Sequence, residues 1–302
     1  MNAHEDIATT ARSVADRLGA AVVAVGQDGR GTGLVIAPGK VLTNAHNLRD
    51  RTTSVTFADG RTAQGSVVGS DHDGDLVVLD VDTGLVAPAA WADRAPSAGD
   101  MVFALSRGGH RQRISYGMVS SVELAFQGPR GRTIQGGIEH SAPLARGSSG
   151  GPLVDAAGLV IGLNTHRIGH GFYVARTIDA ALRATIDEMA AGKSVRRVHL
   201  GVALAPPAVA AKLRRSVGLP ERDGLLVRAV EPDSPASRAG LVEGDLLVAV
   251  GDSSLDSIDG LHAALSAAGD SIVVTIVRGV EERVVTISLA DDADDADEAG
   301  DA

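Results

Sequence analysis

Between about Ala20 and Thr177, short apolar runs alternate with turns rich in Gly, Asp and Asn. Each run has the length of a strand, and β-branched residues are frequent in it, as is typical of β-structure. Many short strands at nearly regular spacing indicate an all-β barrel or sandwich. Examples of predicted strands are Ala21–Val25, Gly33–Ala37, Ser54–Phe57, Leu76–Val81, Met101–Leu105, Gly117–Val122 and Leu159–Leu163.

Apolar residues recur at helical spacing on either side of this β-rich part. Near the N-terminus they are Ile7, Ala11, Val14 and Leu18. Their spacing of three or four residues predicts an amphipathic helix over residues 1–19, packed on the following domain. A surface for a partner or a membrane is the alternative. An alanine-rich pattern over Ile178–Ala191 predicts a second helix, and we assign residues 181–197 to helix and linker.

The segment 198–290 has a different pattern, in which strands and helices are mixed. Extended runs are Val198–Leu204, Ile272–Arg278 and Glu282–Leu289, and helical runs are Ala208–Val217 and Ser257–Ala267. The mixture predicts a separate α+β domain. The acidic residues 291–302 have no apolar anchors, which predicts a disordered tail.

Composition and charge narrow the class of protein. Hydrophobic residues make up 44% of the 302 residues and aromatic ones only 2%, so the cores must be aliphatic. The absence of cysteine excludes a thiol nucleophile and a disulfide framework. A net charge of −10 argues against nucleic acid as a partner.

No apolar run reaches the roughly 20 residues of a membrane span, and the N-terminal residues do not resemble a secretory signal. We therefore expect a cytoplasmic protein. The alternative is the bacterial cell envelope, with an export segment that this sequence does not include.

A glycine-bracketed turn, Gly147–Pro152, presents a serine in a setting that suits a nucleophile. Successive amides in such a turn can converge on a developing oxyanion, and an oxyanion hole over Gly147, Ser148 and Ser149 would take its N–H donors from Gly147 and Ser149, with Ser148 between them. Such turns are also common in β-proteins, so the motif alone leaves a simple turn serine open.

Two further residues could activate the serine of this turn as a nucleophile. His46 follows an apolar strand, where a lone histidine is often structural, and Asp75 precedes another strand. A serine hydroxyl needs a base to take its proton, and that base needs a carboxylate to orient it. His46, Asp75 and Ser149 stand in one of the known chain orders for this triad, so we expect them to be catalytic.

The segment Asp71–Asp75 superficially resembles a calcium loop. The match fails because Leu76 stands where the loop requires glycine, and Asp82 stands where it requires Glu. We expect no metal and no cofactor.

Three segments resemble the HtrA/Deg family of serine proteases. They are Gly31–Ile36 with Leu42–His46, Asp75–Leu79, and Gly147–Pro152 with Leu159–Thr165. The resemblance implies a mainly β fold: a chymotrypsin-like double β-barrel over residues 20–180, with the triad in the cleft between the barrels.

The segment His140–Arg146 departs from the family pattern. By resemblance it helps to wall the specificity pocket, whose expected residues are Pro143, Leu144, Leu163, Asn164 and Thr165. Pro143 carries no acid, so we expect a small or medium aliphatic residue at the cleavage site. Ser148 cannot pair with a newly cut N-terminal amine, so ordering of loops around Arg107–Arg113 and Gly128–Gly137 is the expected activation.

Residues 198–290 resemble the PDZ domains attached to these proteases, in Leu200–Val202, Gly224–Val227, Ser234–Ala236, Ala239–Leu241 and Gly244–Asp245. A PDZ domain binds a peptide C-terminus as an added strand. The resemblance implies a carboxylate loop at His199, Leu200, Gly201 and Val202, and a groove wall at Leu261 and Leu265.

The leading functional hypothesis is an ATP-independent serine endopeptidase that degrades unfolded proteins, with C-terminal peptides bound at the PDZ groove. The rival hypothesis is a latent or degenerate protease that acts as a PDZ-based binding module or chaperone. A simple esterase fits poorly, because strand–helix alternation is missing. The family also implies a trimer, but no aromatic residue precedes Phe57 to build its usual N-terminal contacts.

Overall fold

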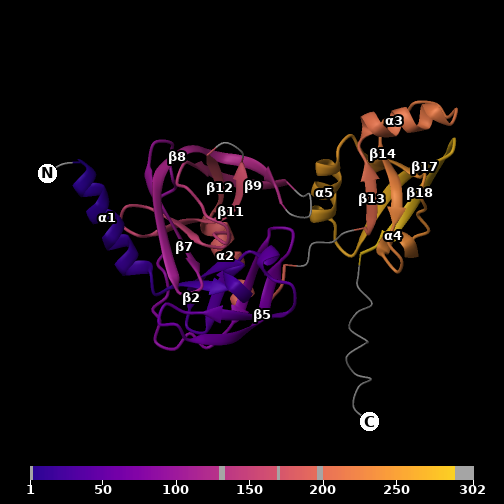
Figure 1. Cartoon of the computed structure of the whole chain (residues 1–302). Coiled ribbons are helices and arrows are strands. Elements are labelled where there is room, and N and C mark those ends of the chain that lie inside the picture. Colours follow the sequence, from indigo (N-terminus) through magenta and orange to yellow (C-terminus); the bar gives the residue numbers. More distant parts are fainter. Residues whose placement is uncertain (1–2, 129–132, 169–170, 196–199, 290–302) are drawn as a thin grey trace, which may run out of the picture. The chain divides into compact units, whose positions relative to one another are not determined.

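The structure is a computed structural model that describes residues 3–128, 133–168, 171–195 and 200–289 (Figure 1). The chain forms two compact units, unit 1 (residues 1–196) and unit 2 (residues 197–302). Within the described ranges, no helix is long and apolar enough to cross a membrane. The predicted tail 291–302 lies outside the described residues.

The first six strands of unit 1 close into a barrel in the order β1-β2-β3-β6-β5-β4. Their bounds are β1 (Val22–Val25), β2 (Gly31–Ala37), β3 (Lys40–Thr43), β4 (Thr52–Thr56), β5 (Thr62–Asp71) and β6 (Leu76–Asp80). Two short 3₁₀ helices, η1 (Gln27–Gly29) and η2 (Ala45–Asn47), lie between strands. β5 was not predicted, because Thr, Gln, Gly and Ser interrupt its apolar residues.

The next six strands close a second barrel in the order β10-β11-β12-β9-β8-β7. Their bounds are β7 (Met101–Gly108), β8 (Arg111–Gln127), β9 (Thr133–His140), β10 (Pro152–Val154), β11 (Val160–Ile168) and β12 (Phe172–Thr177). The segment Arg107–Arg113, which we expected to be a loop, is a hairpin in which Gly108 pairs with Arg111. The two closed barrels confirm the predicted double β-barrel.

One hydrophobic core is shared by the two barrels. Leu34 of β2, Phe103 of β7 and Leu163 of β11 are all buried in it. A smaller cluster, which includes Ile138 and Leu153, fills the rest of the second barrel. Because apolar side chains of both barrels pack together, the barrels form one unit, and loops from each can meet in a fixed geometry.

Two helices complete unit 1. α1 (Ala3–Leu18) inserts Val14 and Leu18 into the shared core, and Figure 1 shows it along the outside of unit 1 beside β8. α2 (Ala180–Ala190) inserts Ile186 and Met189 into the same core. The apolar spacing of α1 therefore reflects packing on the barrels.

Unit 2 is a sheet in the order β13-β14-β15-β17-β18, with β16 paired to β15. The strands are β13 (Val202–Ala205), β14 (Leu225–Val230), β15 (Leu246–Val250), β16 (Ser253–Ser254), β17 (Ser271–Arg278) and β18 (Glu281–Ser288). The helices are α3 (Pro207–Ser216), α4 (Pro235–Arg238) and α5 (Ile258–Ala267). The mixture confirms the α+β class of this domain.

Arg107 is a buried cation, 2% exposed, at the junction of α1 and the barrels. Its guanidinium donates from Nε to Val22 O at 2.6 Å and from Nη2 to Gly19 O at 2.7 Å. Gly19 directly follows α1, so the positive charge faces the negative end of the helix dipole. Burial lowers the pKa of the Arg107 guanidinium, which nevertheless stays charged at neutral pH.

Replacing this cation should destabilise unit 1. In Arg107→Met, two buried carbonyls lose their donors, so we expect the free energy of unfolding to fall by about 2–4 kcal/mol. Trp91, the single tryptophan of the chain, lies in unit 1, so its fluorescence in urea follows that unit. The exposed Arg111→Met is the matched control, and an equal loss in both variants would contradict this account.

Candidate active site

The three predicted catalytic residues lie in three turns that the barrels bring together. His46 is in η2, directly after β3, and Asp75 is in the turn between β5 and β6. Ser149 is in the turn between β9 and β10 of the second barrel. The site is therefore assembled from both barrels.

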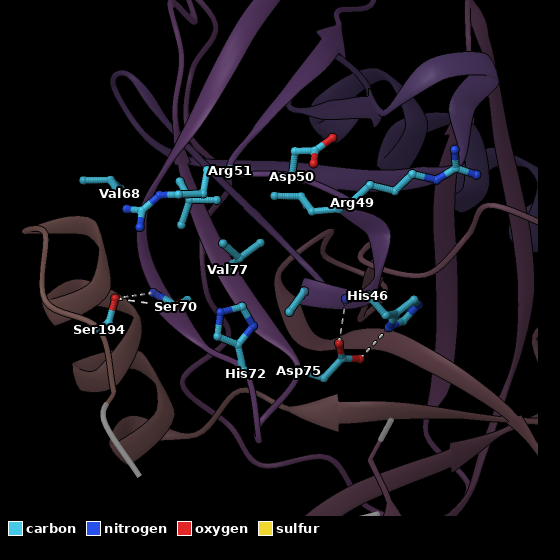
Figure 2. A pocket seen from close by; sticks show the side chains of 13 residues that line it. His46, Arg49, Asp50, Arg51, Val68, Ser70, His72, Asp75, Val77 and Ser194 are labelled. Carbon is cyan, nitrogen blue, oxygen red and sulfur yellow. Dashed lines mark hydrogen bonds and ion pairs between the residues drawn. The ribbon is translucent and has the colours of Figure 1, made fainter. Parts of the chain in front are cut away.

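His46 and Asp75 are joined by two hydrogen bonds (Figure 2). His46 Nδ1 lies 2.7 Å from Asp75 Oδ2, and the backbone N–H of His46 donates to Asp75 Oδ1 at 3.0 Å. Asp75 is 2% exposed, while the imidazole of His46 is partly open to solvent. A buried carboxylate held on Nδ1 favours the tautomer that leaves Nε2 able to accept a proton.

The backbone of Asp75 adopts an unusual conformation to make this contact. Its φ of 56° lies in the left-handed region, which a non-glycine residue seldom occupies. Its carbonyl accepts hydrogen bonds from Ala45 N at 3.1 Å and Asn44 Nδ2 at 2.9 Å. The segment that carries His46 therefore forms hydrogen bonds with both the backbone and the side chain of Asp75.

Arg176 of β12 holds the same turn from the second barrel. Its Nη1 donates to Gly74 O at 2.5 Å and lies 3.8 Å from Asp71 Oδ2. Asp71 is fully buried and accepts the N–H of Gly74 at 2.9 Å. Sequence reasoning missed Arg176, because no local motif marks an arginine that acts on a turn so distant along the chain.

Ser149 is the second residue of the second of two consecutive β-turns. Ser148 N donates to Ala145 O at 3.2 Å, and Gly151 N donates to Ser148 O at 2.9 Å. Gly147 (φ 82°) and Gly150 (φ 83°) occupy the third positions of these turns, where a positive φ is typical of type II turns. A Cβ on Gly147 would lie 2.5 Å from Gly29 O, and one on Gly150 would lie 2.1 Å from Thr32 O. Both positions therefore require glycine.

The serine turn is hydrogen-bonded to the first barrel. Ser149 O accepts Thr32 N and Asn47 Nδ2, both at 2.9 Å. Thr32 Oγ1 also donates to Gly147 O at 2.7 Å. Asn47 follows His46 directly, so the residue after the histidine contacts the residue expected to be the nucleophile. Sequence reasoning missed both residues, although Thr32 lies in a segment that resembles the protease family and Asn47 directly follows another.

Thr165 contacts both the carboxylate and the serine. Its Oγ1 donates to Asp75 Oδ2 at 3.3 Å, and its carbonyl accepts Ser149 Oγ at 3.1 Å. Thr165, which we expected only in the specificity pocket, thus also links Asp75 to Ser149. The sequence did not indicate this second contact.

Two amides of the serine turn are available to a ligand. Among the described residues, no hydrogen bond leaves the N–H of Gly147 or of Ser149. The N–H of Ser148, which lies between these two residues, closes the first turn instead. The pair Gly147 and Ser149 remains as candidate donors.

A buried polar layer lies beneath the turn. Asn164 Nδ2 donates to Gly151 O at 3.0 Å, so its Oδ1 accepts from His140 Nε2, also at 3.0 Å. Burial lowers the pKa of His140 to about 4, and its Nδ1 has no hydrogen-bond partner within the described ranges. A neutral imidazole fits this site, because a protonated Nδ1 would be a buried donor without an acceptor.

The other expected pocket residues differ in exposure. Pro143 is exposed and Leu144 packs partly against the core of the second barrel. Leu163 and Asn164 are fully buried. Their role in specificity stays a prediction.

In unit 2, Leu200, Leu261 and Leu265 pack in one hydrophobic core. Gly201 precedes β13, which begins at Val202 and forms one end of the sheet. A strand at the end of a sheet has one unpaired edge, to which a peptide can add. His199 lies outside the described residues.

A cavity of about 550 Å³ lies beside the His46–Asp75 pair (Figure 2). Val68 and Val77 form apolar parts of its lining, and Arg51 and His72 form polar parts. Across the described residues, no group of three or more His, Cys, Asp or Glu side chains is arranged to hold a metal ion.

Comparisons with known proteins define the class. Residues 31–163 match the trypsin-like peptidase domain, and residues 226–278 match the PDZ domain. The chain is 32% identical over 282 residues to the serine protease HhoA of Synechocystis, covering 87% of this chain and 71% of HhoA. The chain belongs to the HtrA/Deg family of serine proteases, as its motifs indicated.

Other relatives agree with this assignment. A DegP-like protein of Halomonas elongata, described as a probable periplasmic serine endoprotease, is 31% identical; the match covers 89% of this chain and 58% of the relative. This chain thus spans little more than half of that relative's length. The solved serine endoprotease of Yersinia pestis superposes with a TM-score of 0.64 at 25% identity, covering 92% of this chain and 96% of that one.

The expectation of a cytoplasmic location is wrong. The DegP-like relatives of Halomonas and Brucella are described as periplasmic, which points to the cell envelope. The character of the N-terminal residues was a poor guide, because neither the fold nor the site depends on the compartment in which the protein works.

His140 should make unit 1 sensitive to acid. The unfolded chain binds a proton near pH 6.5 and the folded one only near pH 4, so stability is complete above pH 6.5 and falls as the pH drops towards 4. We expect a loss of about 3 kcal/mol between pH 7 and pH 4. The control His140→Gln can still donate to Asn164 but does not titrate, so its loss should be smaller by that amount.

Urea unfolding, followed by Trp91 fluorescence at several pH values, measures the free energy of unfolding of the wild type and of His140→Gln. Parallel pH profiles for the wild type and His140→Gln would show that His140 is not the titrating group.

Proposed function

We propose that this chain is an ATP-independent serine endopeptidase that cleaves unfolded or misfolded proteins in the cell envelope. The observation that carries the proposal is the hydrogen-bonded His46–Asp75 pair beside a serine turn in which two amides donate to no other described residue. The sequence contains no phosphate-cradling P-loop, which supports cleavage without ATP.

In the proposed reaction, His46 Nε2 takes the proton of Ser149 as Oγ attacks the substrate carbonyl. The hydroxyl donates to Thr165 O in this structure, so its O–H must rotate towards His46 Nε2 before the proton is transferred. Asp75 stabilises the imidazolium that forms, through the 2.7 Å contact at Nδ1. His46 then gives the proton to the leaving amine, and an acyl group remains on Ser149.

The N–H groups of Gly147 and Ser149 stabilise the oxyanion of this reaction. They are fixed before the substrate arrives, because both turns around the serine are closed by hydrogen bonds. Preorganised donors of this kind each contribute about 3 kcal/mol to transition-state stabilisation.

The acyl side of the site selects a small or medium aliphatic residue. Support comes from Pro143, where no acid is present to bind Lys or Arg, and from Leu144 beside it. The side chain of Pro143 is uncharged. Its carbonyl accepts a hydrogen bond from Ser115 Oγ at 2.6 Å, which holds this segment against β8.

The PDZ domain binds peptide C-termini and regulates the protease. The free edge of β13 accepts the peptide as a strand, and the loop at Leu200 and Gly201 holds its carboxylate. Leu261 and Leu265 support the groove from the core beneath it. Assembly into a homo-oligomer stays a prediction.

Casein degradation tests the proposal. We expect the wild type to cleave casein and Ser149→Ala to lose cleavage by about 10⁴-fold or more, because the nucleophile is removed. Hydrophobic C-terminal peptides should stimulate the wild type if the PDZ domain controls the site.

A fluorophosphonate probe, which reacts with activated serines, distinguishes an active protease from the rival hypothesis of a latent or degenerate one. A wild type that neither cleaves casein nor labels at Ser149, with or without peptide, would favour the PDZ-based binding module or chaperone. Cleavage that persists in Ser149→Ala would mean that another residue is the nucleophile.

A further inference from the structure

A polar groove of about 800 Å³ borders the serine turn on the side of the first barrel. We call it the basic groove, because Arg30, Arg49 and Arg146 line it and Asp50 is its only acidic residue among the described lining. Its volume lies in the range of sites that hold small ligands. The groove is distinct from the cavity beside the His46–Asp75 pair, although Arg49 and Asp50 border both.

The charge of the basic groove is opposite to that of the chain. The whole chain carries a net charge of −10, yet three arginines gather here against one aspartate. All three are exposed, and none forms an ion pair with a carboxylate among the described residues. Figure 2 shows Arg49 extending away from Arg51; both border the cavity beside the His46–Asp75 pair, but only Arg49 also lines the basic groove. The lining of the groove thus carries an excess of positive charge, with Asp50 offsetting only part of it.

Its contacts fix where the groove lies relative to the reaction. Arg146 directly precedes Gly147, whose N–H is a candidate oxyanion donor. Asn47, which also lines the groove, follows His46 and donates to Ser149 O at 2.9 Å. The groove therefore begins at the serine turn and follows the element that carries the histidine.

This position corresponds to the leaving half of a substrate. His46 must reach the leaving amine to protonate it, so that half extends past the histidine element. The expected pocket for the acyl half uses other residues, Pro143–Leu144 and Leu163–Thr165. None of these residues lines the basic groove.

We propose that the basic groove binds an acidic side chain within the first few residues after the cleaved bond. The inference rests on the proposed endopeptidase function and adds a charge preference on its leaving-group side. Arginine suits this task, because its planar guanidinium binds a carboxylate through two parallel hydrogen bonds and stays charged at all relevant pH values. Exposed pairs are weak and screened by salt, so the preference should be modest and fall with ionic strength.

Matched internally quenched peptides test the inference. Three peptides share one aliphatic cleavage site and differ only in carrying Glu, Gln or Lys at the three positions after it. We expect the wild type to cleave the Glu peptide with a kcat/KM about fivefold above that of the Gln peptide, and the Lys peptide most slowly. The Glu-to-Gln ratio should shrink between about 50 mM and about 500 mM salt.

The variant Arg30→Gln/Arg49→Gln should bring the Glu-to-Gln ratio close to one. Arg146 is left unchanged in it, because a change beside Gly147 could disturb the oxyanion donors. Arg12→Gln/Arg111→Gln removes the same charge from exposed positions outside the groove and should keep the wild-type ratio.

A wild-type ratio near one, a preference for Lys, or a ratio that survives in Arg30→Gln/Arg49→Gln would overturn the inference. Cleavage of the Gln peptide and fluorophosphonate labelling report the protease itself. A normal Gln rate without a charge preference therefore rejects only the groove, whereas no cleavage and no labelling would reject the endopeptidase and the groove together.

Discussion

The carbonyl of Ser149 is held by two donors of the first barrel, Thr32 N and Asn47 Nδ2, and the site depends on this contact. It joins a turn of the second barrel to the segment that carries His46. The contact forms only because glycines at positions 147 and 150 let the turn approach Gly29 O and Thr32 O closely. The shared apolar core holds the barrels at the distance that this approach requires.

The same junction fixes the aspartate. Asp75 keeps a left-handed backbone, with its carbonyl held by Asn44 and its turn held by Arg176 of the second barrel. Such a conformation persists only when its surroundings over-determine it, and here both barrels contribute. Thr165 then links the carboxylate to the serine. Asp75 and Ser149 are therefore each held by groups from both barrels, and His46 is held in turn by Asp75, which explains why the two barrels must pack as one unit.

The sequence predicted the barrels and the triad because both leave local signals. Apolar runs mark strands such as β6, and glycines mark the turn around Ser149. Strands with mixed polarity, such as β5, lacked such a signal, and at Arg107–Arg113 the glycines marked a turn while the polar residues around them hid the paired strands. The supporting residues Asn47, Arg176 and His140 could not be identified, because their partners are distant along the chain and only the fold brings them together. The exposure of the expected pocket residues could not be predicted either, because it depends on how the second barrel packs around them.

The central claim is that the docked serine turn makes Ser149 reactive, and Gly147→Ala tests it most directly. A methyl group there would meet Gly29 O at 2.5 Å in a backbone of φ 82°. Gly99→Ala is the control, with a similar φ of 90° and no atom within 4 Å of the added methyl. We predict that fluorophosphonate labelling of Ser149 slows about 100-fold in Gly147→Ala and keeps its wild-type rate in Gly99→Ala. Equal labelling rates in the two variants, with unit 1 folded by Trp91 fluorescence, would contradict the account.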